Sequence, residues 1–179
     1  MDFLELCKNR YSVRKFSERA VEKEKLEKIL EAGRLAPTAK NSQSQRIFVL
    51  KTQAALQKIY DATPMAYNAP IVLAVCYEKS ASYKNTSETV YVDSECGAYD
   101  GGEVDAAIVN TSMMFEAAEL GLGTLWARGF DSAKIMKALN LPETLHLVCL
   151  LDIGYPAEDS VPSERHSQRL AICETVKEL

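Results

Sequence analysis

Three short apolar runs, separated by segments with helical periodicity, constrain the fold of this chain most strongly. They are "RIFVL" (46–50), "PIVLAVCY" (70–77) and "LHLVCLLDIGYP" (145–156), and a further strand is expected to start within "GLGTLWARGF" (121–130). β-Branched residues are frequent in these runs, and such residues favour strands. Each run is shorter than the roughly 20 apolar residues of a membrane-spanning helix. The pattern predicts a mixed α and β protein built on one sheet.

The segments between these runs carry apolar residues at helical spacing. Helices are expected at 2–9, 22–36, 52–62, 103–120 and 131–141. Thr52 and Asp131 stand where N-caps are needed, because their side-chain oxygens can accept a hydrogen bond from a free amide of the first turn. The segment 103–120 has little polar surface after Asp105, which is typical of a central, buried helix.

Composition limits the possible functions. The chain has 179 residues, 47% hydrophobic and 26% charged, which fits a single domain covering residues 1–179. Its net charge of −4 argues against nucleic-acid binding, which would need a basic face. Five scattered cysteines without a C-x-x-C motif argue against a disulfide framework or a metal site and favour a cytoplasmic location. The N-terminus lacks the apolar stretch of a secretory signal, and no run could span a membrane.

The segment "RYSVRKF" places three cations and a serine within seven residues of an acidic chain. Side chains alternate in an extended segment, so Arg10, Ser12 and Arg14 are expected on one side, with Tyr11 and Val13 facing a core. Guanidinium forks and a hydroxyl match the oxygens of a phosphate. A solvated turn with surface ion pairs explains the same spacing equally well, and both interpretations stay open at this point.

Two further segments supply polar or planar groups. "PTAKNSQSQ" (37–45) offers amides and hydroxyls that either read the polar edge of a heterocycle or form an ordinary solvated loop. Trp126 either lines a planar ligand or fills the core. The tail cluster "ERHSQR" contributes only if it folds back onto the same anion. The chain has no P-loop and no G-x-G-x-x-G, so side chains would have to hold any phosphate.

Taken together, these segments resemble the nitroreductase family of FMN-dependent oxidoreductases. Four stretches carry the resemblance in order: "NRYSVRKF", "EKLEKILEAGRLAPTAKNSQSQRIFVL", "AAELGLGTLWARGF", and "IGYP" with "RHSQRL". It implies an α+β, nitroreductase-like fold with a central mixed, mainly antiparallel sheet flanked by helices. It also implies an obligate homodimer with exchange of C-terminal arms. "QSQ" (43–45) replaces the family's Q-P-W, and the long polar insertion 78–101 matches no part of the family pattern.

The resemblance also implies roles in an FMN site. Arg10 and Ser12 would hold the phosphate and ribityl end, and Arg14 would reach the N1/O2 edge of the ring. Arg169, with one of Arg165, His166 and Ser167, would close on the phosphate. Residues 37–43 would come from the other subunit, and the backbone of 126–129 would pass the N5 side. The implied cofactor residues are Arg10, Ser12, Arg14, Pro37, Thr38, Ala39, Asn41, Gln43, Asp105, Trp126, Ala127, Arg128, Gly129 and Arg169.

The activity implied by the resemblance is reduction of a small organic acceptor, such as a nitroaromatic or a quinone, by NADH or NADPH. Hydride transfer is chemistry that the flavin performs, so no catalytic side chain is expected. Donor and acceptor would then react one after the other, in a ping-pong sequence. The competing hypothesis is a non-catalytic protein that binds flavin or another phosphate ligand. The sequence leaves the acceptor and the choice between NADH and NADPH open.

Overall fold

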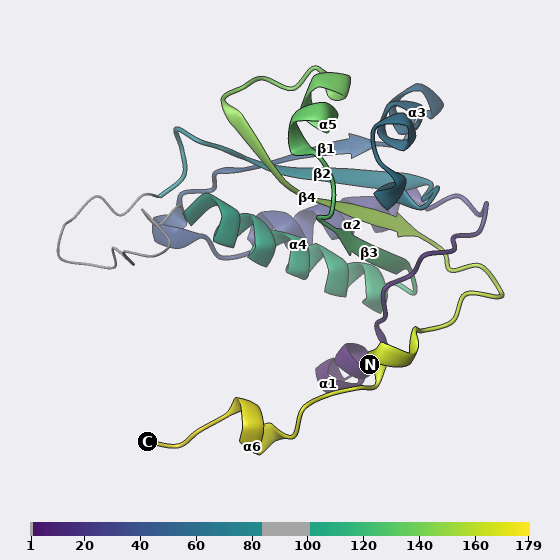
Figure 1. The fold of residues 1–179 in the computed structure, drawn as a ribbon, viewed down its shortest axis with the longest axis vertical. Helices are drawn as coiled ribbons and strands as arrows, with labels where there is room; N and C mark the ends of the chain where they lie inside the picture. Colours follow the sequence, from purple (N-terminus) through teal and green to yellow (C-terminus); the bar gives the residue numbers. More distant parts are fainter. Residues whose placement is uncertain (1, 84–100) are drawn as a thin grey trace.

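A computed structural model describes residues 2–83 and 101–179, and its centre is one four-stranded sheet (Figure 1). The order across the sheet is β1-β2-β4-β3, and every pair of neighbouring strands is antiparallel. The strands are β1 (Gln45–Leu50), β2 (Ile71–Glu78), β3 (Gly123–Ala127) and β4 (Leu145–Gly154). All four runs predicted as strands are confirmed. Most of the 78–101 insertion lies outside the described residues.

Five helices of the described residues follow the prediction, and a sixth, α6 in the tail, was not predicted. They are α1 (Phe3–Asn9), α2 (Lys23–Leu35), α3 (Gln53–Ala62), α4 (Gly101–Glu119), α5 (Ser132–Leu139) and α6 (Ile172–Thr175), with 3-10 turns at Ala39–Asn41, Pro64–Ala66 and Glu164–His166. Thr52 caps α3 by accepting from the Ala55 amide at 3.3 Å, and Asp131 caps α5 by accepting from the Lys134 amide at 3.1 Å. Both predicted N-caps are therefore confirmed.

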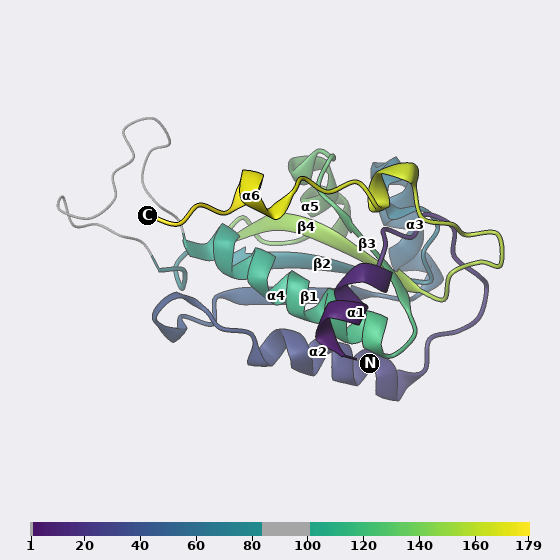
Figure 2. The same cartoon turned by 90° about the horizontal axis from the view of Figure 1, so that it is seen from below.

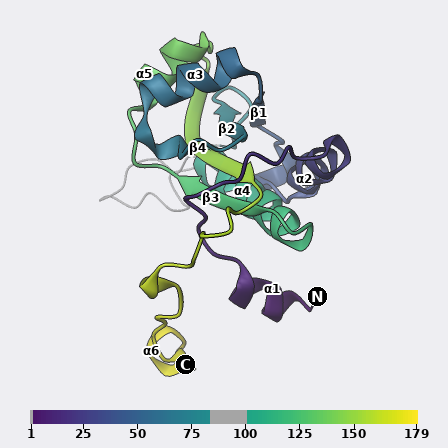
Figure 3. The same cartoon turned by 90° about the vertical axis from the view of Figure 1, so that its right-hand side faces the viewer.

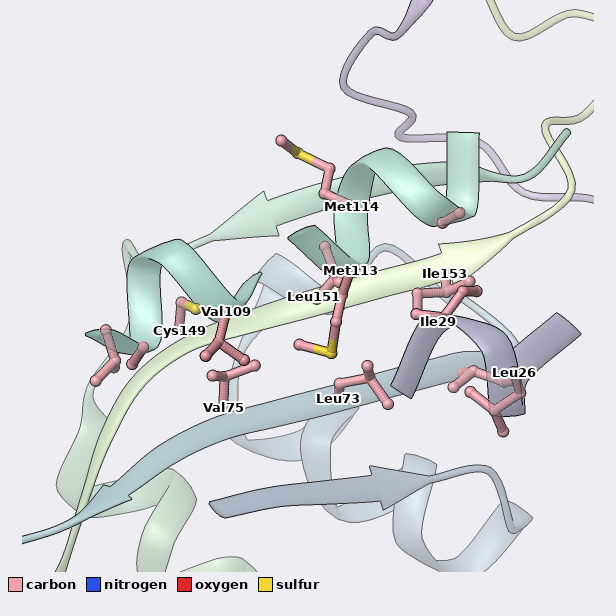
Figure 4. Close-up of a cluster of buried hydrophobic side chains, with 14 of the residues drawn as sticks. Leu26, Ile29, Leu73, Val75, Val109, Met113, Met114, Cys149, Leu151 and Ile153 are labelled. Atoms are coloured by element: carbon pink, nitrogen blue, oxygen red, sulfur yellow. The ribbon is translucent and has the colours of Figure 1, made fainter. Parts of the chain in front are cut away.

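Two helical layers enclose the sheet. In Figures 1 and 3, α3 and α5 cover one face, while α2 and α4 cover the other. Figure 2 shows α2 and α4 side by side below the sheet. They approach closely at Gly33, where a Cβ would stand 2.8 Å from the Cγ of Met113. Figure 4 shows the core between these helices and the strands, built from residues such as Ile29, Val109 and Leu151.

Helix α1 and the C-terminal tail lie together, away from the main body (Figures 1 and 3). The Tyr11 hydroxyl donates to the Ser160 carbonyl at 3.2 Å, and a ring nitrogen of His166 is 2.9 Å from the Lys8 carbonyl oxygen. The buried residue of α1 is Leu6. Phe3 and its neighbour Leu4 are mostly exposed, although the Phe3 ring also lies 5.2 Å from the ring of Phe115 on α4.

Candidate functional site

The segment 10–16 is extended, as predicted, and the structure shows that it docks beside β3. Ser12 forms a parallel bridge with Thr124, and the Val13 amide donates to the Thr124 carbonyl at 2.9 Å. Val13 is buried, and a Cβ on Gly123 would come within 2.5 Å of its side chain. Glycine at the start of β3 therefore allows the segment to approach the edge strand. The exposed Arg14 donates to the Ser12 carbonyl at 3.3 Å.

Arg10 lies in a small pocket of about 110 Å³ at the C-terminal end of α4, with Ala118 and Gly121 in its wall. Its Nε is buried and has no hydrogen-bond partner among the described residues. Burial lowers the pKa of Arg10, and the nearby cation of Arg169 lowers it further. Two residues predicted to hold a phosphate are therefore close enough for their positive charges to repel each other. An anion between them would offset both this repulsion and the burial of the Arg10 charge.

The tail brings Arg169 close enough to Arg10, within the same protomer, for the two charges to interact. Arg169 donates to the Gln168 carbonyl at 2.7 Å and lines a pocket of about 420 Å³ beside α1. His166 and Ser167 line the same pocket, together with Cys7. The Arg165 carbonyl also accepts from Arg169, at 3.4 Å, so all three tail residues proposed to accompany Arg169 lie beside it.

The loop 37–45 is ordered by the carboxylate of Asp105 on α4. Asp105 is buried and accepts from the Ala39 amide at 2.9 Å and from the Ser42 hydroxyl at 3.1 Å. The Thr38 hydroxyl accepts from the Gln43 amide at 3.1 Å. Backbone φ angles are positive at Lys40, Asn41 and Gln43. Both oxygens of Asp105 are thus used to fix this loop, which makes Asp105 a residue that shapes the loop of its own protomer.

The end of β3 presents the third set of predicted residues. Trp126 is 39% exposed and pairs with Leu151 of β4. Ala127 is buried, whereas Arg128 and Gly129 are exposed. A Cβ on Gly129 would meet only the Met65 methyl group, at 3.9 Å. The backbone after β3 is therefore open to an approaching planar molecule.

Two residues that sequence reasoning missed contact this end of β3. Glu103, on the first turn of α4, accepts from Arg128 at 3.2 Å, and its other oxygen is 3.2 Å from His146 on β4. The sequence separates these three residues by up to 43 positions and links them by no motif. Only the order of the strands and the packing of α4 on the sheet bring them together.

The predicted cofactor residues fall into two groups, which lie at opposite edges of the sheet of one protomer. Segment 10–14 and residues 126–129 share the β3 edge, and about four residues of strand, roughly 13 Å, connect them. The loop 37–45 leads into β1 at the opposite edge, three strand spacings or about 14 Å away, with α4 between. One protomer therefore presents two partial sites, one at each edge of its sheet.

The residues at the β3 edge fit a flavin mononucleotide. Arg10, Arg169 and the Ser12 hydroxyl suit its phosphate, and the buried, unpartnered Nε of Arg10 is the atom that such an anion would satisfy. In 2–83 and 101–179, no three His, Cys, Asp or Glu side chains gather as metal ligands do. Across the same ranges, none of the helices has the length and apolar composition needed to cross a bilayer.

Comparison with known proteins identifies this arrangement. The sequence profile of the Nitroreductase family matches residues 7–155. A crystal structure of a nitroreductase family protein from Clostridium difficile is 34% identical, with a TM-score of 0.87 over 99% of this chain and 98% of that one. A Desulfovibrio desulfuricans protein crystallised in complex with FMN has the same fold, at 24% identity and a TM-score of 0.80 over 100% of this chain and 97% of its own.

A curated relative from Methanothermobacter thermautotrophicus, provisionally named NADH dehydrogenase/NAD(P)H nitroreductase, is 29% identical over 89% of this chain and 80% of its own length. The family profile covers most of the chain, and the element order, the antiparallel sheet and the helical layers agree with the solved structures. The α+β, nitroreductase-like fold predicted from the four sequence stretches is confirmed, although the described sheet is antiparallel throughout rather than mixed, and the homodimer with exchanged arms stays a prediction. The chain belongs to the Nitroreductase family.

Proposed function

We propose that this protein is an FMN-dependent oxidoreductase that uses NADH or NADPH to reduce a small organic acceptor, such as a nitroaromatic or a quinone. The observation that carries the proposal is the pairing of Arg10 and Arg169, in which a buried guanidinium nitrogen has no partner. Family membership and the FMN-bound neighbour support flavin as the ligand. The name of the archaeal relative supports a nicotinamide donor.

When bound, FMN supplies the hydride chemistry, which explains why the site needs no nucleophile. The protein's own residues bind and orient it. Arg10, Ser12 and Arg169 hold the phosphate, and the backbone after Trp126 runs along the N5 side of the ring. Arg14 is exposed on the segment 10–16 and would turn toward the N1/O2 edge of the ring, where a cation stabilises negative charge.

The second half of the site comes from a second copy of the chain. In one protomer the loop 37–45 lies at the β1 edge, so its residues reach a flavin at the β3 edge only from a partner subunit. The apolar side chains exposed on α1, α4 and the tail give this partner a surface to cover: Phe3, Leu4, Val104, Ile108, Leu170, Ile172 and Val176. The proposed assembly is a homodimer in which the C-terminal arms are exchanged.

The visible absorption spectrum of the purified protein tests the proposal. We expect a flavin band that bleaches under anaerobic conditions when NADH or NADPH is added and returns when an acceptor follows. Parallel lines in double-reciprocal plots would support the ping-pong order. A flavin band that neither donor bleaches would favour a non-catalytic binding protein, and no band after addition of FMN would contradict flavin binding altogether.

A further inference from the structure

Three polar side chains from three different elements meet beside the end of β3. Glu103 comes from α4, Arg128 follows β3, and His146 comes from β4. The Glu103 carboxylate accepts from the Arg128 guanidinium at 3.2 Å and is 3.2 Å from His146 Nε2. The three side chains are 41%, 57% and 39% exposed, and they lie beside residues 126–129, along which the flavin ring is proposed to lie. The grip on the phosphate needs none of them.

Two local features build this group. A β-bulge at Val148 interrupts the alternation of side chains along β4. His146 is thereby turned to the face that α4 covers, with its ring centroid 5.3 Å from that of Tyr77. Bulges commonly re-aim a side chain beside an active site. A Cβ on Gly102 would stand 2.2 Å from the Tyr77 ring, so glycine lets the start of α4 settle there and brings Glu103 within reach.

The ion pair with Glu103 engages only one nitrogen of the Arg128 guanidinium group. At an ordinary surface pair of this protein, Arg34 donates to both oxygens of Glu31, at 2.6 and 2.7 Å. Glu103 instead divides its oxygens between Arg128 and His146, so Arg128 has a single, longer contact. A guanidinium carries five N–H donors. Within the described part of the chain, Glu103 is the one residue to which Arg128 hydrogen-bonds, so most of these donors are available to a ligand.

Trp126 adds a flat apolar surface next to this cation. Trp126 pairs with Leu151 across β3 and β4, on the face of the sheet that α4 covers, and about two fifths of the residue is exposed. An aromatic surface beside a cation with free donors matches a planar molecule that bears a carboxylate. We propose that Arg128 binds the carboxylate of the planar acceptor that this enzyme reduces. The proposal rests on the function proposed above, which places the acceptor beside residues 126–129.

Glu103 then acts as a positioning residue that also competes with the substrate. It holds the guanidinium in place, and its negative charge offsets part of the attraction for an incoming anion. Removing the cation and removing the carboxylate must therefore have opposite effects on anionic acceptors. A purely structural ion pair makes a different prediction, because loss of either partner would weaken the same contact and shift every acceptor in the same direction.

The test uses the FMN-loaded protein and two acceptors of similar size, 4-nitrobenzoate and 4-nitrobenzamide. The measured quantity is the ratio of their kcat/KM values, anionic over neutral. We expect Arg128→Gln to lower this ratio about ten- to a hundredfold, which is the effect of losing a charge-assisted hydrogen bond. Glu103→Gln is expected to raise it about two- to fivefold, in line with an exposed ion pair. Arg34→Gln, the matched control, should leave the ratio unchanged.

A binding measurement supplies a readout that does not depend on turnover. Benzoate added to the oxidised holoprotein should perturb the flavin spectrum, with a dissociation constant that rises in Arg128→Gln and falls in Glu103→Gln. If flavin is bound and 4-nitrobenzamide is reduced but the ratio is the same in all variants, the carboxylate subsite is wrong and the proposed function stands. If the protein neither binds flavin nor turns over, both proposals fail together.

Discussion

At the scale of single residues, Asp152 is the most unusual side chain of the fold. It lies on β4 with no exposed surface, and neither carboxylate oxygen has a hydrogen-bond partner among the described residues. Burial raises the pKa of Asp152 from its ordinary value of 3.8 to about 8. The pKa of Tyr60 is also raised, first by burial and then by the negative charge that Asp152 carries when it is ionised. A carboxyl group in such surroundings is held in its neutral form.

This burial predicts a pH dependence of stability. Between about pH 4 and pH 8, the folded state keeps the Asp152 proton that the unfolded chain releases, so the free energy of unfolding falls as the pH rises. Asp152→Asn removes this pH dependence. Relative to the parent, its free energy of unfolding should therefore rise by a few kcal/mol between pH 5 and pH 8. Urea denaturation at pH 5, 6.5 and 8 measures the difference. The exposed Asp61→Asn serves as control, and parallel pH profiles for parent and Asp152→Asn would refute the expectation.

The phosphate grip makes the second prediction at this scale. Arg10→Ala or Arg169→Ala should weaken FMN binding about ten- to a hundredfold, because each removes a charge-assisted hydrogen bond worth about 1.5–3 kcal/mol. The flavin-to-protein ratio after gel filtration and a titration of apoprotein with FMN give the affinity. Arg34→Ala, which removes an exposed cation far from this pocket, is the control. Full flavin retention in both variants would place the phosphate elsewhere.

Individual residues differ in how far the sequence could predict them. The caps at Thr52 and Asp131 and the inward side of Val13 depend on neighbours close in the chain, and the structure confirms them. Glu103 and His146 depend on a bulge and on helix packing, which leave no mark in a short stretch of sequence. The same holds for Asp105, whose position in the chain suggested contact with the ring but whose bonds go to the loop 37–45.

At the scale of elements, the apolar runs predicted the strands, and the reason is clearest for the interior strands β2 and β4, because a strand buried on both faces needs a continuous apolar sequence. β2 meets this condition, since all of its residues before Glu78 are buried. The order of the strands could not be read from the runs, because their pairing is decided by contacts distant in the sequence. The 3-10 turns in the polar loop and the tail were also missed, since they are short and carry no apolar periodicity.

The loop 37–45 gives a prediction at this scale. Asp105→Ala leaves the Ala39 amide and the Ser42 hydroxyl without an acceptor and should cost about 1–3 kcal/mol of unfolding free energy. Asp105→Asn keeps one acceptor oxygen and should cost less. Thermal denaturation with and without FMN compares the two variants. Equal stability of parent and Asp105→Ala would show that the loop does not depend on this carboxylate.

At the scale of the whole molecule, the exposed apolar tail predicts the assembly state. Light scattering should give about twice the chain mass of 19.9 kDa. Ile172→Glu places a charge on a side chain that is 78% exposed in one protomer and is proposed to be covered by its partner. The variant should shift toward monomers and lose FMN with them. A monomeric parent that retains its flavin would contradict the proposed sharing of the site.

The two partial sites at opposite edges of one sheet have a further consequence for the protein in dilute solution. In the proposed homodimer, a chain that contributes the β3 edge to one flavin would contribute its loop 37–45 to the other, so neither flavin would be fully enclosed until two chains meet. Coenzyme retention then follows mass action in the protein itself. Serial dilution should release flavin along the same curve as subunit dissociation, and added FMN should hold the subunits together at concentrations where the apoprotein separates.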